Sequence, residues 1–255
     1  MSKTERLHRL LNSEIRMRVL ETVHESPKSL RDVHDDLNAP KTTVRDNLQT
    51  LTEFGFVKER RDRRYAATPS GAAALQGVAE LEKRVETADR LRQFLQTADD
   101  EFVLEVKHLE DAIIREPTRS EPNIPITSFI NLYRESSTVQ ARWPVVPPVL
   151  WEHWHDESTV DEATFVLPEP VAECVVDDST EIAERVINGP IEVVATTSSF
   201  ELGIGLFDDT VLLQTFDQNC QPQALVEIGS DPCQAWAHNQ FETALQNGRA
   251  IEESI

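Results

Sequence analysis

Apolar residues in the first part of the chain recur every three or four positions, the spacing of helices that bury one face. They predict helical segments within the first 25 residues, a short helix capped by Ser29, and a further helix from about Lys41 to Phe54. Gly55 suits the left-handed conformation that ends a helix. The pattern then changes to two short strands with a turn centred on Asp62, which predicts a β-hairpin.

A longer amphipathic segment begins after Thr68-Pro69-Ser70 and continues to about Thr97. Its apolar positions step by three and four through roughly three heptads, and polar residues occupy the other faces. These apolar positions are Leu75, Val78, Leu81, Val85, Ala88, Leu91 and Leu95. We interpret the seam as a dimerisation helix, because small DNA-binding domains usually recognise two half-sites. Packing of the seam against its own chain is the alternative.

After Asp99-Asp100-Glu101 the chain alternates between short strands and amphipathic helices, which predicts an α+β protein whose second part has a mixed sheet. The predicted strands are 102–106, 139–143, 164–167, 191–196, 202–207, 211–215 and 224–228. The predicted helices are 128–135, 148–155, 169–175, 180–187 and 232–247. A loop is expected at 116–125, where the sequence has three prolines, and a hairpin turn at Asp208-Asp209.

The formal net charge of −20 is distributed unequally. Residues 1–95 contain 18 Lys+Arg against 15 Asp+Glu, or +3, whereas residues 96–255 contain the other 7 Lys+Arg and 30 Asp+Glu, or −23. Seven of the 25 basic residues lie between Lys41 and Arg64. A nucleic-acid surface is therefore expected only in the first part. An acidic, lysine-poor surface also fits a high-salt cytoplasm, so we expect a halophilic archaeal source.

The helix at 41–54 combines an apolar stripe with a polar face that can bind DNA. Val44, Leu48 and Leu51 form the stripe that faces inward. The residues predicted to contact DNA are Lys41, Thr42, Thr43, Arg45, Asp46 and Gln49. Arginine and lysine can bind guanine, glutamine adenine and aspartate cytosine, while threonine and lysine near a helix start suit phosphate. The hairpin adds basic residues for the backbone or minor groove: Lys58, Arg60, Arg61, Arg63 and Arg64.

Three segments resemble archaeal and bacterial winged-helix regulators: Leu30–Val33, Thr42–Val57 and Tyr65–Gly71. The second contains T-V-x-x-x-L-x-x-L-x-x-x-G-x-V before a charged wing, and the third contains T-x-x-G before the next helix. The resemblance implies a winged helix-turn-helix domain and double-stranded DNA as its partner. It places Thr42, Thr43, Arg45, Asp46 and Gln49 in the recognition helix, and Arg61, Arg63 and Arg64 in the wing.

The second part resembles the C-terminal domain of haloarchaeal regulators of the TrmB type and of filament-associated methanogenesis regulators. The resemblance rests on Pro144-Val145-Val146, Gly203–Asp209 and the last helix with Trp236. It implies a phospholipase-D-like α/β fold without the phospholipase chemistry, and it identifies no effector. We therefore divide the chain into a winged helix-turn-helix domain at 1–68, a linker or dimerisation helix at 69–98, and an acidic sensor or assembly domain at 99–255.

Enzyme and metal signatures are lacking in the sequence. It has no H-x-K-x4-D, G-x-S-x-G or H-E-x-x-H motif and no Walker loop. His153 and His155 are two positions apart, so a helix would point them to different faces. Cys174, Cys220 and Cys233 are widely spaced and are interpreted as buried thiols, with redox sensing as the alternative. We predict no catalysis, no cofactor and no metal.

These features predict a sequence-specific DNA-binding transcriptional regulator that acts as a homodimer. A small effector in the second domain is compatible with its size. No apolar run reaches the roughly 18 residues of a membrane span, and the charged N-terminal segment is unlike a signal peptide, so we expect a cytoplasmic protein. The alternatives are an enzyme targeted by the winged helix, an architectural chromatin protein, and a winged helix that binds protein.

Overall fold

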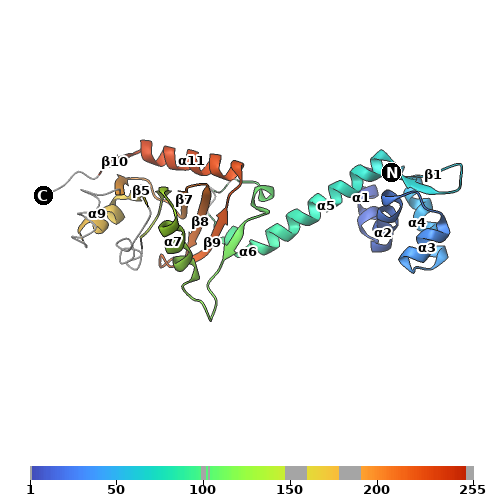
Figure 1. Cartoon of the computed structure of the whole chain (residues 1–255), viewed down its shortest axis with the longest axis horizontal. Helices are drawn as coiled ribbons and strands as arrows, with labels where there is room; N and C mark the ends of the chain where they lie inside the picture. The colour runs from blue at the N-terminus through green and yellow to red at the C-terminus, as the bar shows by residue number, and fades with distance from the viewer. Residues whose placement is uncertain (1, 99–101, 103, 147–159, 178–190, 251–255) are drawn as a thin grey trace. The chain divides into compact units, whose positions relative to one another are not determined.

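The computed structural model describes residues 2–98, 102, 104–146, 160–177 and 191–250 (Figure 1). Two compact units are present, Met1–Val85 and Glu86–Ile255. The first contains mainly helices and a short hairpin, and the second contains a large mixed sheet with helices. The predicted α+β fold class is thus confirmed. The boundary between the units falls inside helix α5, Pro69–Arg90, rather than at Asp99.

The first unit has the predicted order of helices followed by a hairpin. Its elements are α1 (Lys3–Leu11), α2 (Glu14–Glu25), α3 (Leu30–Leu37), α4 (Lys41–Glu53), β1 (Val57–Glu59) and β2 (Tyr65–Ala67), followed by the start of α5. Gly55 has a φ of 76°, the left-handed conformation expected after α4. One face of each helix contributes to a common core, which includes Leu10, Leu20, Val44 and Leu48.

Side-chain caps mark where α2 and α3 begin. Ser29 and Asp32 form a capping box: the Ser29 hydroxyl accepts from the Asp32 amide at 3.2 Å, and the Asp32 carboxylate accepts from the Ser29 amide at 2.9 Å. Ser13 caps α2 in a similar way by accepting from the amide of Arg16. Asn38, with a φ of 49°, ends α3. The turns between helices are therefore set locally by the sequence.

The long helix predicted to reach Thr97 is interrupted. It consists of α5 and a separate helix α6, Arg92–Thr97, with Leu91 between them outside the helical conformation. Leu91 and Phe94 are both fully buried in the second unit. The break therefore lets the chain direct both side chains into that core.

The predicted seam of seven apolar residues is divided by this arrangement. Leu75 and Val78 pack in the core of the first unit, whereas Leu91 and Leu95 pack in the core of the second. Ala88 is half-buried. Leu81 and Val85 remain exposed. The seven residues therefore do not form one continuous seam from Leu75 to Leu95 that could pack against a second copy. Of the seven, Leu81 and Val85 are the exposed ones.

The second unit is built on an eight-stranded sheet in the order β10-β6-β5-β4-β7-β8-β9-β3. Strands β4, β5 and β6 are mutually parallel and the other pairs are antiparallel, so the sheet is mixed as predicted. Its strands are β3 (Ile113–Arg115), β4 (Thr138–Arg142), β5 (Glu162–Pro168), β6 (Ile191–Thr196), β7 (Leu202–Phe207), β8 (Thr210–Phe216), β9 (Pro222–Ile228) and β10 (Gly248–Ala250). Its described helices are α6, η1 (Val106–Leu109), α7 (Ile124–Glu135), α9 (Glu169–Asp177) and α11 (Asp231–Gln246).

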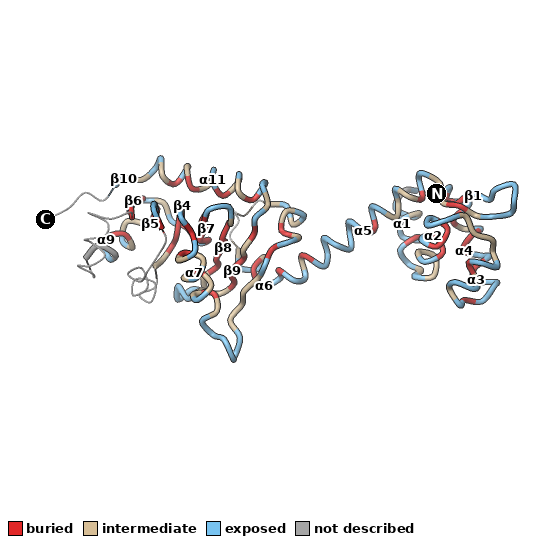
Figure 2. The backbone as a smooth tube through the Cα atoms, viewed as in Figure 1, coloured by how far each residue is buried: buried red, intermediate tan, exposed pale blue. Residues whose placement is uncertain are grey.

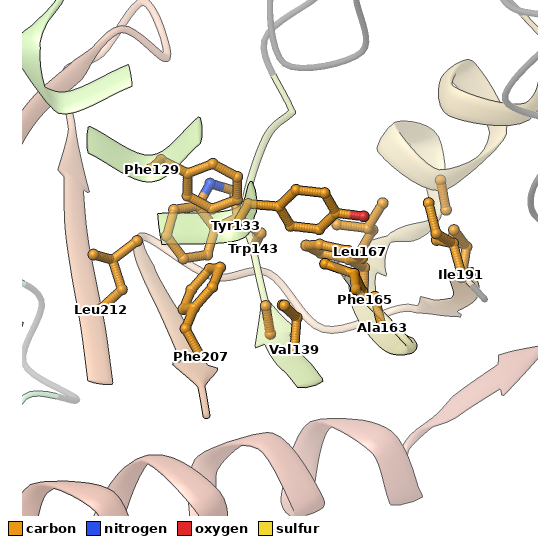
Figure 3. Close-up of a cluster of buried hydrophobic side chains, with 14 of the residues drawn as sticks. Phe129, Tyr133, Val139, Trp143, Ala163, Phe165, Leu167, Ile191, Phe207 and Leu212 are labelled. Carbon is orange, nitrogen blue, oxygen red and sulfur yellow. The ribbon is translucent and has the colours of Figure 1, made fainter. Parts of the chain in front are cut away.

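Helices α7 and α11 cover opposite faces of the sheet (Figure 1). On the α7 face, aromatic residues gather in one core, with Phe129 against Trp143 at 5.1 Å and against Phe207 at 5.4 Å between ring centroids (Figure 3). A β-carbon at Gly203 would lie 2.9 Å from the Trp143 ring, so this strand position requires glycine. On the other face, residues of α11 pack in shared cores with the central strands. Figure 2 shows buried stretches along α11 and along these strands in red.

Several sequence expectations for this unit are wrong. The strand expected at 102–106 is absent from its described residues: Phe102 packs edge to face on Phe94 and on Trp236, and the 3₁₀ helix η1 begins at Val106. Cys174 and Cys220 are exposed, so only Cys233 is a buried thiol. The short edge strands β3 and β10 were not predicted.

The helices predicted at 148–155 and 180–187 lie outside the described residues, as do His153, His155 and the segment 99–101.

Candidate nucleic-acid interface

Helix α4 presents the predicted polar face to solvent. Val44, Leu48 and Leu51 are fully buried, which confirms the inward stripe. The residues expected to contact DNA lie on the other side: Lys41, Thr42, Arg45, Asp46 and Gln49 are exposed, and Thr43 is half-buried. Because α4 begins at Lys41, the first three of the six residues lie in its first turn, where free backbone amides favour phosphate oxygens.

Three hydrogen bonds restrict which α4 side chains are free to bind a base. The buried Asn47 donates from Nδ2 to the Thr43 carbonyl oxygen at 2.8 Å, so its side-chain amide is already hydrogen-bonded within the helix. Thr50 donates from Oγ1 to the carbonyl oxygen of Asp46. Gln49 donates from Nε2 to Oε1 of Glu53 at 3.1 Å, and both residues are exposed. Gln49 can therefore exchange this partner for a base edge.

The hairpin between β1 and β2 holds the basic wing in a defined turn. The Arg60 amide donates to the Arg64 carbonyl oxygen at 2.7 Å, and Arg63 adopts a left-handed φ of 61°. The Asp62 carboxylate accepts from the Arg64 amide at 3.2 Å, so the one acidic residue of the tip stabilises the turn. All five predicted basic side chains, Lys58, Arg60, Arg61, Arg63 and Arg64, belong to exposed residues.

Strand β2 contacts α2, and strand β1 contacts α4. Lys28 and Tyr65 pair through two backbone hydrogen bonds of 3.0 and 2.7 Å, which extends the hairpin by a short third segment. Burial and the negative charge of Glu59 raise the pKa of the Tyr65 phenol, and the positive charge of Arg45 in α4 acts in the opposite direction. Helix α4 and the hairpin are thus neighbours on one side of the unit.

The start of α3 adds charged groups to this side. Hydrogen bonds from the backbone and hydroxyl of Ser29 lower the pKa of the Asp32 carboxyl, and the charges of Arg64 and Arg31 lower it further. Arg31 is strongly exposed and forms an ion pair with Asp35 at 3.6 Å. Sequence reasoning did not assign Arg31 to the interface. Its place in the first turn of α3, next to the capping box, was the available signal.

The second unit contains a polar hollow of about 220 Å³ where β4 and β5 begin. It is lined by Thr138, Val139, Gln140, Glu162, Thr164, Leu206 and Asp208. Asp208 has a left-handed φ of 49° and accepts hydrogen bonds from the amides of Ser137 and Thr138 and from the Thr138 hydroxyl. These bonds, foremost that from the Thr138 backbone, lower the pKa of the Asp208 carboxyl. Asp208 therefore fixes the strand ends around the hollow.

The described ranges hold no group of three or more His, Cys, Asp or Glu side chains arranged to bind a metal ion. Of the helices in the same ranges, none combines the length and apolar character needed to span a membrane.

Two family models match separate parts of the chain. Residues 4–90 match the HVO_A0261 N-terminal domain, and residues 122–247 match the middle domain of the methanogenesis regulatory protein FilR1. These matches confirm the resemblance to haloarchaeal and methanogenesis regulators. No curated protein matches the sequence.

Solved structures resemble the chain at low sequence identity. The archaeal chromatin protein TrmBL2 is 14% identical over 98% of this chain and 100% of its own, with a TM-score of 0.42. NucT from Helicobacter pylori is 8% identical over 55% of this chain and 98% of its own, with a TM-score of 0.41. The phospholipase D family member Nuc from Salmonella typhimurium is 12% identical over 56% of this chain and 99% of its own, with a TM-score of 0.40.

Proposed function

We propose that this chain, which joins an HVO_A0261-type N-terminal domain to a FilR1 middle domain, is a DNA-binding transcriptional regulator. The observation that carries the proposal is the exposed polar face of α4 beside a basic wing, in a protein whose remaining sequence is strongly acidic. The match to a domain of a regulatory protein supports regulation as the biological role.

In this proposal α4 enters the major groove. Arg45 and Gln49 read base edges, because both are exposed on the face opposite the buried stripe and both side chains can form two hydrogen bonds to one base. Lys41, Thr42 and Thr43 bind phosphate at the start of the helix. The wing arginines Arg61, Arg63 and Arg64 follow the DNA backbone, so they contribute affinity with little sequence preference.

The acidic second part restricts the orientation of the complex. Its formal charge of −23 after residue 95 repels phosphate, so the duplex is directed to the α4 and wing surface. In a high-salt cytoplasm the gain from counterion release is small, and contacts to bases must supply more of the affinity. Such a protein would discriminate strongly between operator and bulk DNA.

Two finer features belong to the same proposal. The regulator acts as a homodimer, because two copies of one small winged domain read a site long enough to be specific. A small polar effector binds the hollow at the start of β4 and β5, where Gln140, Glu162 and Thr164 offer hydrogen-bond partners. Binding there would affect DNA binding only if the effector had different affinities for the two states of the regulator.

The second part is proposed to act without catalysis. The sequence lacks the H-x-K-x4-D motif with which phospholipase D enzymes bind and attack phosphate. Incubation of the full chain with a chromogenic phosphodiester tests this point. Hydrolysis of the phosphodiester that co-purifies with this protein, and that disappears when the protein is removed from the sample, would favour an enzyme that is targeted to DNA by its winged helix.

Selection from a random duplex library with the full chain, at low and at high potassium chloride, tests DNA recognition. We expect enrichment of one sequence that contains two related half-sites. Chromatin immunoprecipitation then separates a regulator, with few sharp peaks, from an architectural protein with broad coverage. Failure to enrich any sequence at any salt concentration would rule out the proposed function.

A further inference from the structure

A hollow of about 350 Å³ lies in the second unit where the 3₁₀ helix η1 meets the start of α11. Its side chains with charged or titratable groups come from η1 and the turn that follows, and residues 228–230 close it from the α11 side. These side chains are Lys107, His108, Glu110 and Asp111, and we call the site the η1 hollow. Its volume lies within the range of small-molecule sites, which begins at roughly 300 Å³. It shares no lining residue with the hollow at the start of β4 and β5.

The η1 segment, residues 106–112, holds the end of α5. Arg90, the last residue of α5, donates from its guanidinium to three backbone oxygens of this segment. The distances are 2.7 Å to Ala112, 2.6 Å to Glu110 and 3.3 Å to Leu109. Hydrogen bonds from a charged donor are stronger than neutral ones, so the contact is firm. Because Glu110 also lines the η1 hollow, the hollow and the Arg90 contact share a residue.

The start of α11 holds the other side of the η1 segment. The His108 carbonyl oxygen accepts from the Ser230 hydroxyl at 3.1 Å and lies 3.5 Å from the Cys233 sulfur. A ligand in the η1 hollow would therefore touch a segment that is bonded both to α5 and to α11. Helix α5 also belongs to the first unit, because Leu75 and Val78 pack in the core of that unit. A change in the η1 segment thus acts on a helix that continues into the DNA-binding unit.

The charges of the η1 hollow define the kind of ligand that it fits. Lys107 supplies one positive charge and Glu110 and Asp111 supply two negative charges, so the lining sums to 1 − 2 = −1. Two further carboxylates are close to the hollow in the chain. Glu105 pairs with Lys107 at 2.9 Å, and Asp231 begins α11. The complementary ligand therefore has two positive groups and one negative group.

A basic amino acid has this set of charges. Its carboxylate can pair with Lys107 and accept a hydrogen bond from the His108 ring, and its two cationic groups can pair with Glu110 and Asp111. A simple anion would be repelled by the two carboxylates, and a diamine would leave Lys107 facing a like charge. Arg90 does not compete for the ligand carboxylate, because its guanidinium is bonded to backbone oxygens.

From these charges and contacts we infer that the η1 hollow is a regulatory site for a basic amino acid and that Arg90 conveys its occupancy to α5. Binding of the amino acid is independent of the proposed function, whereas its effect on DNA affinity rests on it. A ligand that binds one arrangement of the η1 segment more tightly than another shifts the protein toward that arrangement. By linkage, DNA affinity then changes with the concentration of the ligand.

Isothermal titration of the full chain with L-lysine tests the site. L-Norleucine lacks the side-chain ammonium of lysine and cadaverine lacks its carboxylate, so both are matched control ligands. We expect L-lysine to bind and each control ligand to bind at least roughly tenfold more weakly. Lys107→Gln and Asp111→Asn should weaken lysine binding by a similar factor. Arg119→Gln and Glu121→Gln, at exposed positions of the second unit outside the hollow, should bind lysine as the wild type does.

Hydrogen exchange of the full chain with and without L-lysine tests the connection to α5. In the wild type we expect lysine to change exchange both in the η1 segment and at the end of α5, because Arg90 joins them. Arg90→Lys keeps the charge but cannot donate to three carbonyl oxygens from one planar group. This variant should still bind lysine, and the exchange of α5 should no longer respond to it.

Absence of lysine binding, equal binding of either control ligand, or hollow variants that bind as tightly as the control variants would overturn the site. Lysine binding that leaves α5 exchange unchanged, or a full response in Arg90→Lys, would overturn the role of Arg90. Duplex selection with the same samples separates these outcomes from the proposed function. A chain that binds lysine and enriches no DNA sequence would keep the site and remove the regulator, and a chain that enriches an operator without binding lysine would do the reverse.

Discussion

Gln49 of α4 donates a hydrogen bond to Glu53 one turn later, with 3.1 Å between Nε2 and Oε1. Both residues are exposed on the face proposed to enter the major groove. The pair therefore places a carboxylate next to an amide that is expected to read a base. In the proposed complex the pair would oppose base binding in two ways, because it occupies the Gln49 amide and because the Glu53 carboxylate repels phosphate.

Replacement of Glu53 by alanine should tighten binding to the selected operator several-fold, because one negative charge leaves the DNA-facing surface and Gln49 becomes free. The fold should tolerate the change, since a carboxylate in the last turn of a helix opposes the helix dipole. Fluorescence anisotropy with labelled duplex measures the dissociation constant. Glu59→Ala, at the wing, is the control for a simple loss of charge. Weaker binding by the Glu53 variant would instead show that the pair positions Gln49.

Arg45→Ala and Gln49→Ala should each cost about 1–3 kcal/mol in operator binding, the range for one good contact to a base edge. Binding to unrelated duplex should change much less, because these residues are expected to contact bases. Arg119→Ala, an exposed arginine in the second unit, controls for the loss of a positive charge. Anisotropy titrations with operator and scrambled duplex give both affinities. Equal losses on the two duplexes would contradict base readout.

The elements that sequence reasoning located well are those whose signals are local. Helix α4 starts at the predicted Lys41, and strands β6 and β7 have the predicted bounds 191–196 and 202–207. Periodicity, caps and β-branched runs define such elements within a few residues. The strands β3 and β10 were missed because each has three residues and exists through pairing with β9 or β6.

The break at Leu91 could not be predicted, because the apolar period continues through it and only the burial of Leu91 and Phe94 in the second unit explains the turn. In the candidate site, too, some features follow from local sequence signals and others depend on tertiary packing. Which side chains of α4 face outward follows from the helical period. The pairing of Gln49 with Glu53 and the ion pair of Arg31 with Asp35 depend on packing and rotamers.

Acidification should reveal the role of Asp208. Its folded pKa lies below the ordinary value because backbone amides stabilise the carboxylate, so its contribution to stability is present above the unfolded pKa and is lost as the pH falls through the folded pKa. In Asp208→Asn this part of the pH dependence should disappear, and asparagine still tolerates the left-handed φ. Chemical unfolding between neutral and acidic pH measures the difference. Parallel pH profiles of variant and wild type would show that the carboxylate is not stabilised in the fold.

Removal of the wing charges should change the salt dependence of DNA binding more than its sequence preference. Arg61, Arg63 and Arg64 lie at an exposed turn that is held by Asp62 and by the hydrogen bond from Arg60 to Arg64. Those turn contacts use backbone atoms of the arginines, so alanine substitutions should leave the turn in place. Each phosphate contact that is lost should reduce the slope of log affinity against log salt by about 0.9.

The wing variant Arg61→Ala/Arg63→Ala/Arg64→Ala should therefore bind operator and unrelated duplex more weakly than the wild type, by a similar factor for both. The difference in affinity between this variant and the wild type should be greatest at low salt, where phosphate contacts contribute most. Anisotropy titrations over a range of potassium chloride concentrations give both slopes. The triple variant Arg84→Ala/Arg90→Ala/Arg92→Ala is a poor control, since Arg90 donates to the carbonyl oxygens of Leu109, Glu110 and Ala112. Arg18→Ala together with Arg119→Ala removes exposed charge away from the wing without such contacts. An unchanged slope in the wing variant, with the slope of this control also unchanged, would show that the wing does not touch phosphate and that α4 alone accounts for binding.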